Sequence, residues 1–411
     1  MITDAAFAPC ARSDILDVRF GRGALLYEMA DRRLHTLNAS AVMVWRRLDG
    51  LTTLCDIARS VSDTFAADRS IVQGDVAAVV ARFEEVGLLI TSDEAALAAR
   101  SAIAAESGEV ESVERPVQLL EQLDALEWAS VSPVYRAVGL MFRVRSEDVD
   151  VATELGRVLR SLSTTRGDGD TDHVYSIRAR VHEGVAQWRV YFDGKAIKTV
   201  VSSDAAVALV LWHIDEAVVT HSPDALFFHG AAVQFGERVV MFPGPMNSGT
   251  STLTTALVRR GLPYLSNGEV ALDVSVGAAV PFPKAISLDG ATRVFFPELF
   301  PDEPTGTAEL APGRWHIDPA AIAGATLGTG GRVALVISPH YLAGASTRLE
   351  RVTDVDAVRL LLDNSYEFAR LGNRAFDALV TVAQESVVFR LEYSELDAAC
   401  EVVLQLAREI R

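Results

Sequence analysis

Residues 238–253, which read RVVMFPGPMNSGTSTL, constrain the fold more than any other part of the chain. Apolar residues that predict a strand come first, glycines follow, and Ser251 opens a helix with an apolar inner face. Gly244, Gly249 and Ser251 fit the pattern G-x-x-x-x-G-K-[ST] of a phosphate-binding P-loop. Thr250 occupies the position of the lysine. The sequence therefore predicts a cradle for phosphate that lacks its usual cation.

The composition excludes some classes of partner. A chain of 411 residues, 49% of them hydrophobic, is long enough for two or three globular domains. The formal net charge of -17 argues against a general affinity for nucleic acid or anionic membrane, because either would need clustered cations. Lysine occurs only at Lys195, Lys198 and Lys284, so few side chains can replace the missing P-loop lysine.

Cysteine usage and the distribution of apolar residues predict a cytoplasmic location. Cys10, Cys55 and Cys400 are scattered, with no spacing typical of a metal site or a disulfide framework. The first twenty residues carry acids and no continuous apolar run, so no signal peptide is expected. The longest apolar run, residues 205–212, is too short to span a bilayer.

The first ninety residues predict three short strands followed by three helices. The strands are expected at residues 18–20, 24–29 and 33–37, separated by Gly and Asp turns. Asn38 is a favourable N-cap for the first helix, which Gly50 closes. Such an order of elements indicates a small winged-helix-like unit.

This segment resembles the PqqD-like family, whose members recognise the precursors of ribosomally made, post-translationally modified peptides. The residues that carry the resemblance are 25–27, 34–38 (LHTLN), Ala41, 44–45, 48–50 and 87–89. The resemblance implies that a leader peptide adds as a strand beside the third strand and lies against the third helix. The implied contacts are Arg33, Leu34, His35, Thr36, Leu37, Val79, Arg82, Phe83 and Val86.

A winged-helix unit that binds DNA is the alternative for this segment. Its third helix carries Asp75, Glu84 and Glu85 against the single Arg82, whereas contacts to phosphates need the opposite sign. We therefore expect no nucleic-acid partner.

Two segments between the main elements are expected to be irregular. Residues 92–116, rich in Ala and Glu, predict a linker between domains. The acidic run at 166–172 suggests a metal site through Asp168, Asp170 and Asp172, but it lacks the closing Glu of a calcium loop. A solvated turn is the expected structure of that run.

The remaining pattern predicts an α/β protein (α+β overall) with a mixed sheet. Strands are expected at 263–266 and 270–274, joined by a turn at Asn267 and Gly268, because Asn-Gly is a favoured hairpin turn. The expected domains are residues 1–91, a linker at 92–116, a β-rich part at 117–224 and a P-loop domain at 225–411.

The P-loop domain resembles the HPr kinase/phosphorylase-related proteins, which phosphorylate serine on protein or peptide substrates. The residues that carry this resemblance are 229–231 (HGA), 244–252, 260–261, 265–266 and 270–273. The resemblance implies ATP or another nucleoside triphosphate as cofactor, with Mg²⁺ held by Ser251. The implied nucleotide contacts are Gly244, Asn247, Ser248, Gly249, Thr250, Ser251 and Thr252.

The departures from the family pattern predict impaired phosphoryl transfer. Asn267 and Gly268 stand where the resemblance implies two adjacent acids, and Glu269 comes one residue late. An asparagine amide does not take up a proton, and a positioned general base is worth roughly 10²–10⁴ in rate. The hydroxyl of Thr250 gives a neutral hydrogen bond, roughly half as strong as one from an ammonium.

Three arrangements would explain these departures. Lys284 could supply the missing cation, Glu269 could serve as the base, or Asn267 and Gly268 could simply form a turn; the sequence favours the turn. His229 is either close to the phosphates, as the resemblance implies, or a structural residue at a strand end.

The leading hypothesis is a peptide-maturation protein that binds a precursor leader and keeps a kinase-like site with impaired phosphoryl transfer. Its role would be that of a pseudokinase, a chaperone for the core peptide, or an activating partner of another peptide-modifying enzyme. The alternative is an active Ser/Thr peptide kinase that uses Glu269 and Lys284 as relocated groups. A third interpretation is that Thr250 and Asn267 were introduced to trap a complex.

Overall fold

The structure, a computed structural model, divides into two compact units at Val113 and Glu114. It describes residues 7–65, 67–90, 117–164, 171–300, 309–311 and 314–410. The predicted linker at 92–116 lies outside the described residues, as do Asp168 and Asp170 of the predicted acidic turn. Each unit is described by itself below.

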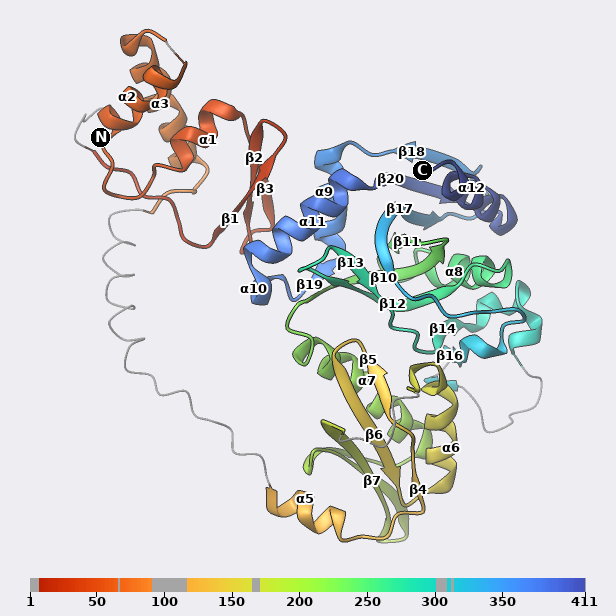
Figure 1. Cartoon of the computed structure of the whole chain (residues 1–411). Helices are drawn as coiled ribbons and strands as arrows, with labels where there is room; N and C mark the ends of the chain where they lie inside the picture. The colour runs from red at the N-terminus through yellow and green to blue at the C-terminus, as the bar shows by residue number, and fades with distance from the viewer. Residues whose placement is uncertain are drawn as a thin grey trace. The chain divides into compact units, whose positions relative to one another are not determined.

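The first unit has the predicted three strands and three helices (Figure 1). They are β1 (Ile15–Phe20), β2 (Gly23–Glu28), β3 (Arg33–Leu37), α1 (Ala39–Trp45), α2 (Leu54–Phe65) and α3 (Arg69–Glu85). Asn38 caps α1 as predicted, because its Oδ1 accepts a hydrogen bond from the amide of Ala41 at 2.9 Å. The strand order β1-β2-β3 leaves β3 at the edge of this sheet.

One apolar core holds this unit together. Trp45 of α1 and Phe83 of α3 meet edge to face with ring centroids 5.5 Å apart, and both are buried. Leu26 of β2 and Ile57 of α2 are fully buried in the same core. All three helices therefore cover one face of the sheet.

The second unit begins with a six-stranded sheet and its helices. The strands are β4 (Ser130–Val131), β5 (Tyr135–Ala137), β6 (Leu140–Ser146), β7 (His173–His182), β8 (Val185–Phe192) and β9 (Lys195–Val200). The helices are α5 (Val117–Asp124), α6 (Val149–Val158), the 3-10 turn η1 (Arg160–Leu162) and α7 (Ser203–Thr220). Ser202 caps α7 by accepting from the amide of Ala205 at 3.2 Å.

An eight-stranded mixed sheet forms the rest of the core of this unit. Its strands are β10 (Ala225–Phe235), β11 (Arg238–Pro243), β12 (Tyr264–Asp273), β13 (Ala278–Val280), β17 (Gly331–Tyr341), β18 (Arg348–Arg351), β19 (Ser365–Tyr366) and β20 (Val387–Tyr393). Strand β11 pairs with β10 on one side and, in parallel, with β17 on the other. Because β10 continues through β12 and β13 to β17, these five strands form a closed circuit.

Helices cover the eight-stranded sheet on two sides (Figure 1). On one side lie α9 (Asp354–Asn364), α10 (Phe368–Leu371) and α11 (Asn373–Glu385), and on the other α8 (Thr250–Arg259) and α12 (Leu396–Glu409). Leu253 of α8 and Val403 of α12 are fully buried in one core with Phe242 of β11. This burial fixes α8, and therefore the loop before it, against the sheet.

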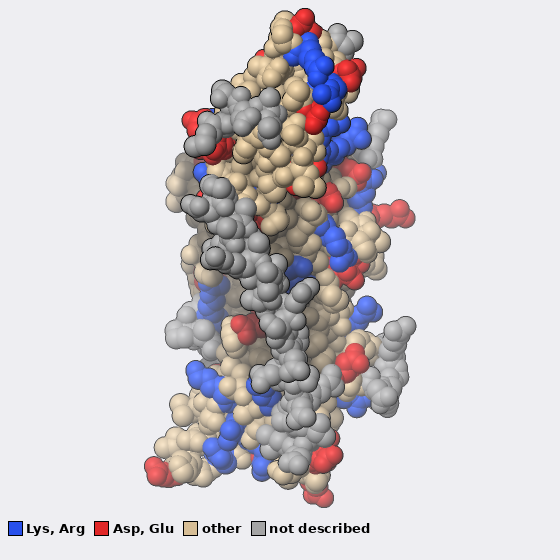
Figure 2. Space-filling view, turned by 90° about the vertical axis from the view of Figure 1, so that its left-hand side faces the viewer, with Lys and Arg blue, Asp and Glu red and all other residues tan. Residues whose placement is uncertain are grey.

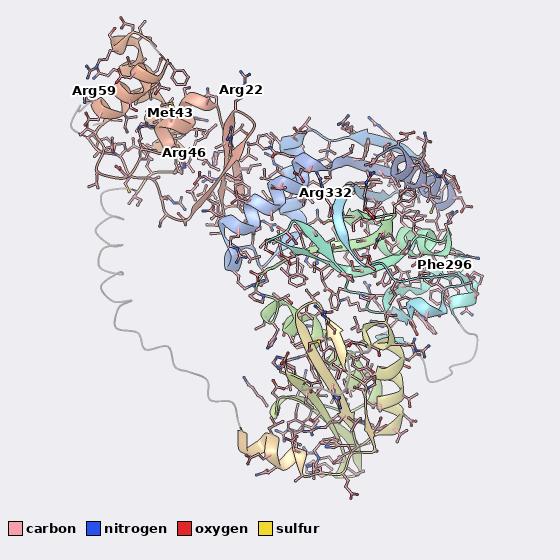
Figure 3. All side chains as sticks on the ribbon, in the orientation of Figure 1. Arg22, Met43, Arg46, Arg59, Phe296 and Arg332 are labelled. Carbon is pink, nitrogen blue, oxygen red and sulfur yellow. The ribbon has the colours of Figure 1, made fainter. Side chains whose placement is uncertain are left out.

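A small sheet borders α8. It consists of β14 (Ile286–Asp289), β15 (Glu309–Ala311) and β16 (Arg314–Ile317), with the 3-10 segments η2 (Gly290–Val294), η3 (Pro297–Leu299) and η4 (Pro319–Ala321). Figure 3 labels Phe296, which lies between η2 and η3 and is only 1% exposed. The buried ring holds this segment against the core around α8.

The two sheets of the second unit share a core. Residues of the six-stranded sheet, such as Phe142 and Tyr175, belong to the same buried cluster as Phe227 of β10 and Ala271 of β12. The β-rich part at 117–224 and the P-loop part at 225–411 are therefore packed as one body. The confirmed fold class is mixed α/β behind an N-terminal three-strand, three-helix unit.

The predicted turn at Asn267 and Gly268 is wrong. Strand β12 runs without interruption from Tyr264 to Asp273, and Gly268 pairs with Gly230 of β10. Gly268 has φ +90° and Gly230 has φ +153°. Because glycine tolerates positive φ, the two strands stay paired at this irregular point. Pairing with β10 outweighs the local preference of Asn-Gly for a turn.

The surface mixes both signs of charge. On the face drawn in Figure 2, Lys and Arg side chains are interspersed with Asp and Glu among other residues. None of the described helices combines the length and the apolar character needed to cross a bilayer. The net charge of -17 is thus spread over a surface that also carries many cations.

Candidate functional site

The glycine-rich loop joins β11 to α8, as the sequence predicts. Gly249 adopts φ +90° immediately before α8, and Asn247 adopts φ +66°, a left-handed conformation that asparagine tolerates. A side chain on Gly249 would place its Cβ 2.4 Å from the hydroxyl of Tyr393. The loop therefore needs glycine there for both its backbone angle and its close approach to β20.

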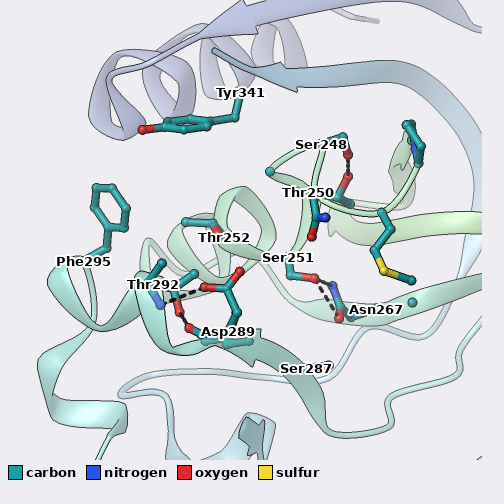
Figure 4. A pocket seen from close by; sticks show the side chains of 18 of the residues that line it. Ser248, Thr250, Ser251, Thr252, Asn267, Ser287, Asp289, Thr292, Phe295 and Tyr341 are labelled. Carbon is teal, nitrogen blue, oxygen red and sulfur yellow. Dashed lines mark hydrogen bonds between the residues drawn. The ribbon is translucent and has the colours of Figure 1, made fainter. Parts of the chain in front are cut away.

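The loop opens onto a cavity of about 500 Å³ (Figure 4). All the nucleotide contacts expected from the sequence line it: Gly244, Asn247, Ser248, Gly249, Thr250, Ser251 and Thr252. The N-terminus of α8 faces the same space, where free amide groups and the helix dipole favour an anion. The volume lies within the range of small-molecule sites.

Thr250 does not direct its hydroxyl toward an anion in this space. Its Oγ1 lies 2.7 Å from Oγ of Ser248, and both side chains are buried (Figure 4). One of these hydroxyls donates to the other, so the pair is held within the loop. The side chain at the lysine position contributes to loop structure and adds no charge.

Ser251 and Asn267 are hydrogen-bonded to each other across the cavity wall. The Nδ2 group of Asn267 donates to Oγ of Ser251 at 3.1 Å, and its Oδ1 lies 3.3 Å from the same oxygen. Asn267 is only 2% exposed. The structure therefore brings these two positions together at the cavity, with an amide where the resemblance implies an acid.

Lys284 and Glu269, the two predicted substitutes, do not line the cavity. The ammonium of Lys284 is paired with Glu269 and lies 2.7 Å from Oδ1 of Asp215 on α7. Burial alone lowers the pKa of Lys284, but the two carboxylates outweigh it and raise that pKa above the ordinary value. Burial raises the pKa of Asp215 to about 6, against the opposing effect of Lys284. The three charges form a structural cluster beneath the site.

His229 lines the cavity from β10. Its ring stacks on Tyr366 of β19, with centroids 4.6 Å apart and an angle of 24° between the planes. Partial burial lowers its pKa, so the imidazole is neutral at pH 7. His229 is thus packed against an aromatic ring at the wall of the cavity, and its closeness to phosphates stays a prediction.

Two charged residues that sequence reasoning missed also line the cavity. Asp289 ends β14 and Arg314 begins β16, and the two are cross-strand partners in the small sheet. Arg314 is the one lysine or arginine among the described residues that line the cavity, and its guanidinium lies 3.4 Å from Sδ of Met246 in the loop. Asp289 accepts a hydrogen bond from the amide of Ala291 at 2.8 Å. No spacing in the sequence relates either residue to the P-loop.

The side chains available to a metal ion at this site are few. Within the described ranges, no three His, Cys, Asp or Glu side chains gather closely enough to hold a metal ion by themselves. The hydroxyl of Ser251 and the carboxylate of Asp289 are oxygen ligands of the kind that Mg²⁺ accepts. A magnesium ion bound beside them would take its other ligands from water and nucleotide phosphates.

The positions predicted to bind a leader peptide lie on β3 and α3 of the first unit. Arg33 and Thr36 are exposed, Leu34, His35, Val79 and Val86 are half-buried, and Arg82 is exposed with an ion pair to Glu85 at 2.5 Å. Leu37 and Phe83 are buried in the core. Those two residues belong to the core of the unit, and Val79 and Val86 pack against the same core while part of each side chain stays exposed.

Comparisons with known proteins support the first unit most directly. Residues 23–89 match the family model described as Coenzyme PQQ synthesis protein D (PqqD). No curated protein matches the chain. Among solved structures, the chain is similar to the Hpr(Ser) kinase/phosphatase from Coxiella burnetii, at 14% identity and a TM-score of 0.23, over 44% of this chain and 93% of that one.

A TM-score of that size carries no argument about the second unit, whose chemistry is therefore inferred from the pocket itself. The family match covers β2 through α3 and includes the edge strand β3. The chain therefore carries a PqqD-like domain at residues 23–89, followed by a larger α/β unit in which a glycine-rich loop joins β11 to α8.

Proposed function

We propose that this chain is a peptide-maturation protein that binds a precursor leader with its PqqD-like domain and a nucleoside triphosphate with its P-loop unit. Phosphoryl transfer at the second site is slow compared with an ordinary kinase. The observation that carries this proposal is the engagement of Thr250 with Ser248 and of Lys284 with two carboxylates, beside a complete loop and an open cavity.

The leader would bind as an added strand on β3. In the described residues, β3 pairs only with β2, so its outer edge offers unpaired amide and carbonyl groups to an extended peptide. Leu34 on β3, Val79 on α3 and Val86 directly after α3 are half-buried and would supply apolar contacts for peptide side chains. The match of residues 23–89 to the PqqD model supports this role.

The triphosphate would lie at the glycine-rich loop. The amides at the start of α8 and the guanidinium of Arg314 are the groups that attract an anion there. Ser251 and Asp289 would hold Mg²⁺, which neutralises phosphate charge when bound. The nucleotide site would thus still contain a cation, but this cation is supplied by β16 and not by the loop.

Slow phosphoryl transfer is expected because, among the described residues, the site lacks the ammonium group and the general base that the resemblance implies beside the phosphates. No lysine is found among the described residues that line the cavity. A preorganised donor at the point where charge develops is worth roughly 10²–10³ in rate. Asn267 holds Ser251 but does not accept a proton. Under this proposal nucleotide binding serves to order the second unit while it presents the core peptide or activates another peptide-modifying enzyme.

Back-substitution tests this proposal. Wild type, Thr250→Lys and Thr250→Lys with Asn267→Asp are titrated with Mg-ATP by calorimetry and then mixed with radiolabelled ATP and their own precursor. We expect micromolar to millimolar binding by all three, a trace of transfer by wild type, and at least a tenfold rise in transfer in the double variant. Val276→Lys adds the same charge at an exposed position outside the cavity and controls for net charge.

Two results would overturn the proposal. One is wild-type protein that phosphorylates its precursor at ordinary kinase turnover. The other is wild-type protein that binds no nucleotide and no anion at the loop.

A second candidate is an active Ser/Thr peptide kinase, favoured by the presence of Asp289 and Arg314 in the cavity. Arg314 would then replace the P-loop lysine and Asp289 would act as the base, roles that Lys284 and Glu269 do not fill because they are paired with each other. This candidate predicts that Arg314→Gln and Asp289→Asn each lower transfer by at least 10²-fold. If wild type shows no transfer, it is excluded.

A further inference from the structure

The cavity has a polar end and an apolar end (Figure 4). Ser251, Asn267 and Asp289 lie at the polar end, next to the glycine-rich loop. At the other end, beyond Thr252, Figure 4 shows the rings of Tyr341 and Phe295 bordering the same open space. A ligand that fills the whole cavity therefore has a charged part and a flat or apolar part.

The apolar end exposes more hydrophobic surface than stability requires. Tyr341 is 44% exposed, Phe295 38% and Val294 79%, and all three line the cavity. Leu396 of α12 completes this end. Contiguous exposed apolar surface of this kind marks a place where another molecule binds.

Tyr341 is held in a fixed position relative to the glycine-rich loop. Its amide donates to the carbonyl of Ser248 at 3.0 Å. Its ring meets Tyr393 edge to face at 5.8 Å, and the hydroxyl of Tyr393 donates to the carbonyl of Gly249 at 3.1 Å. The end of β17 and the loop are therefore one connected structure, which suits a ligand that touches both.

Phe295 is held from the opposite wall. The 3-10 segment η2 before it is capped by Asp289, a residue of the polar end, through the amide of Ala291. The buried ring of Phe296 after it anchors the same segment (Figure 3). One short segment thus connects the carboxylate at one end of the cavity to the aromatic ring at the other.

We propose that Tyr341 and Phe295 form a slot for the purine base of the nucleotide whose phosphates lie on the glycine-rich loop. This inference rests on the proposed function and adds the class of nucleoside. Every nucleobase has an aromatic face, and stacking on a side-chain ring is worth roughly five- to 150-fold in affinity per base. The larger purine gains more from two rings than a pyrimidine does.

We expect the slot to distinguish purines from pyrimidines by their size and to discriminate little between one purine and another. Among the hydroxyls that border the cavity, those of Ser394 and Thr292 are already used as donors, to the carbonyl of Ala345 at 2.8 Å and to that of Asp289 at 2.6 Å. Neither has a free hydrogen to read the edge of a base. ATP and GTP are therefore expected to bind within a few-fold of each other, and both more tightly than UTP.

The test compares nucleotides with inorganic tripolyphosphate, which has the charge but no base. Full-length wild type, Tyr341→Ala, Tyr341→Phe and Phe295→Leu are titrated with the magnesium complexes of ATP, GTP, UTP and tripolyphosphate. Trp212→Ala removes a ring that is 53% exposed on α7, outside the cavity, and serves as the matched control. Thermal melts confirm that each variant is folded.

We expect Tyr341→Ala and Phe295→Leu to weaken ATP and GTP by about tenfold or more, close to the level of tripolyphosphate, while tripolyphosphate binding stays unchanged. Tyr341→Phe and Trp212→Ala should retain wild-type affinity. Unchanged ATP affinity in both slot variants, with tripolyphosphate still bound, would overturn the slot and leave the proposed function standing. Failure of wild type to bind either ATP or tripolyphosphate would overturn both.

Discussion

Thr250 lies at the lysine position of the loop, and its hydroxyl shares a hydrogen bond with the hydroxyl of Ser248. A lysine there would extend its ammonium beyond this pair, whereas threonine ends within it. Asn267 is similar: its amide satisfies Ser251 but provides no base. At these two positions, neutral side chains that hydrogen-bond within the site stand where the resemblance implies charged ones.

His316 makes the stability of the second unit depend on pH. Burial, with the nearby cations Lys284, Arg157 and Arg314, lowers the pKa of His316 to about 4, and its Nδ1 has no hydrogen-bond partner among the described residues. In the unfolded chain the pKa returns to its ordinary value of about 6.5. Between these values the unfolded chain binds a proton that the folded chain excludes, so the free energy of unfolding falls as pH drops from 6.5 toward 4.

The variant His316→Phe should lose this dependence. Urea unfolding at pH 7.5, 6 and 5 gives the difference in unfolding free energy between wild type and variant at each pH. All other titrating groups are common to both proteins. We therefore expect the free energy of unfolding of the variant to rise relative to that of wild type as pH falls. A constant difference would show that His316 is protonated equally in both states.

At the scale of elements, three segments far apart in sequence meet in one charge cluster. Asp215 comes from α7, Glu269 from β12, and Lys284 from the segment before β14. Their side chains are 33%, 18% and 19% exposed. The cluster links the six-stranded and the eight-stranded parts directly beneath the cavity.

Lys284→Met is expected to destabilise the second unit. It leaves two mostly buried carboxylates without a counter-charge, which costs about 3–5 kcal/mol for a fully buried pair and less here because Asp215 is one-third exposed. The triple variant with Asp215→Asn and Glu269→Gln removes the repulsion and should recover most of the loss. Denaturant unfolding measures both; a single variant as stable as wild type would contradict the structural role of the cluster.

The sequence predicts those elements whose causes are local. The strand, loop and helix around Gly249 and the Asn38 cap follow from neighbouring residues, and both are confirmed. The predicted turn at Asn267 and Gly268 is wrong because their strand partners, Ala231 and Gly230, are distant in sequence. Asp289 and Arg314 were missed because the small sheet alone brings them to the cavity. The wrong turn and the two missed residues share one cause: pairing between strands that are far apart in the sequence, which a short stretch of sequence does not show.

At the scale of the whole molecule, the two proposed ligands belong to different units. The leader peptide would bind at β3 and α3, and the nucleotide at the loop before α8. A change that affects one ligand therefore need not affect the other. Separate titrations of the two ligands report on each unit in the intact chain.

Val79→Asp is expected to weaken binding of the leader peptide by at least tenfold, because it places a charge against the apolar side chains of the peptide. Mg-ATP affinity should stay at the wild-type value. Ile71→Asp, on the same helix at a position that is 65% exposed and outside the predicted wall, is the matched control. Equal loss of peptide binding in both variants, measured by fluorescence anisotropy, would place the peptide elsewhere on the unit.

The closed circuit of five strands affects how the pocket can move. A strand at a sheet edge frays at low free-energy cost, but β11 is bonded along both of its edges, to β10 and to β17. The end of β11, where the glycine-rich loop begins, is therefore expected to stay in place until the whole unit unfolds. If the cavity closes around a bound ligand, the movement has to come from the wall that faces the glycine-rich loop. There, only short 3-10 segments and the three-stranded sheet would need to shift.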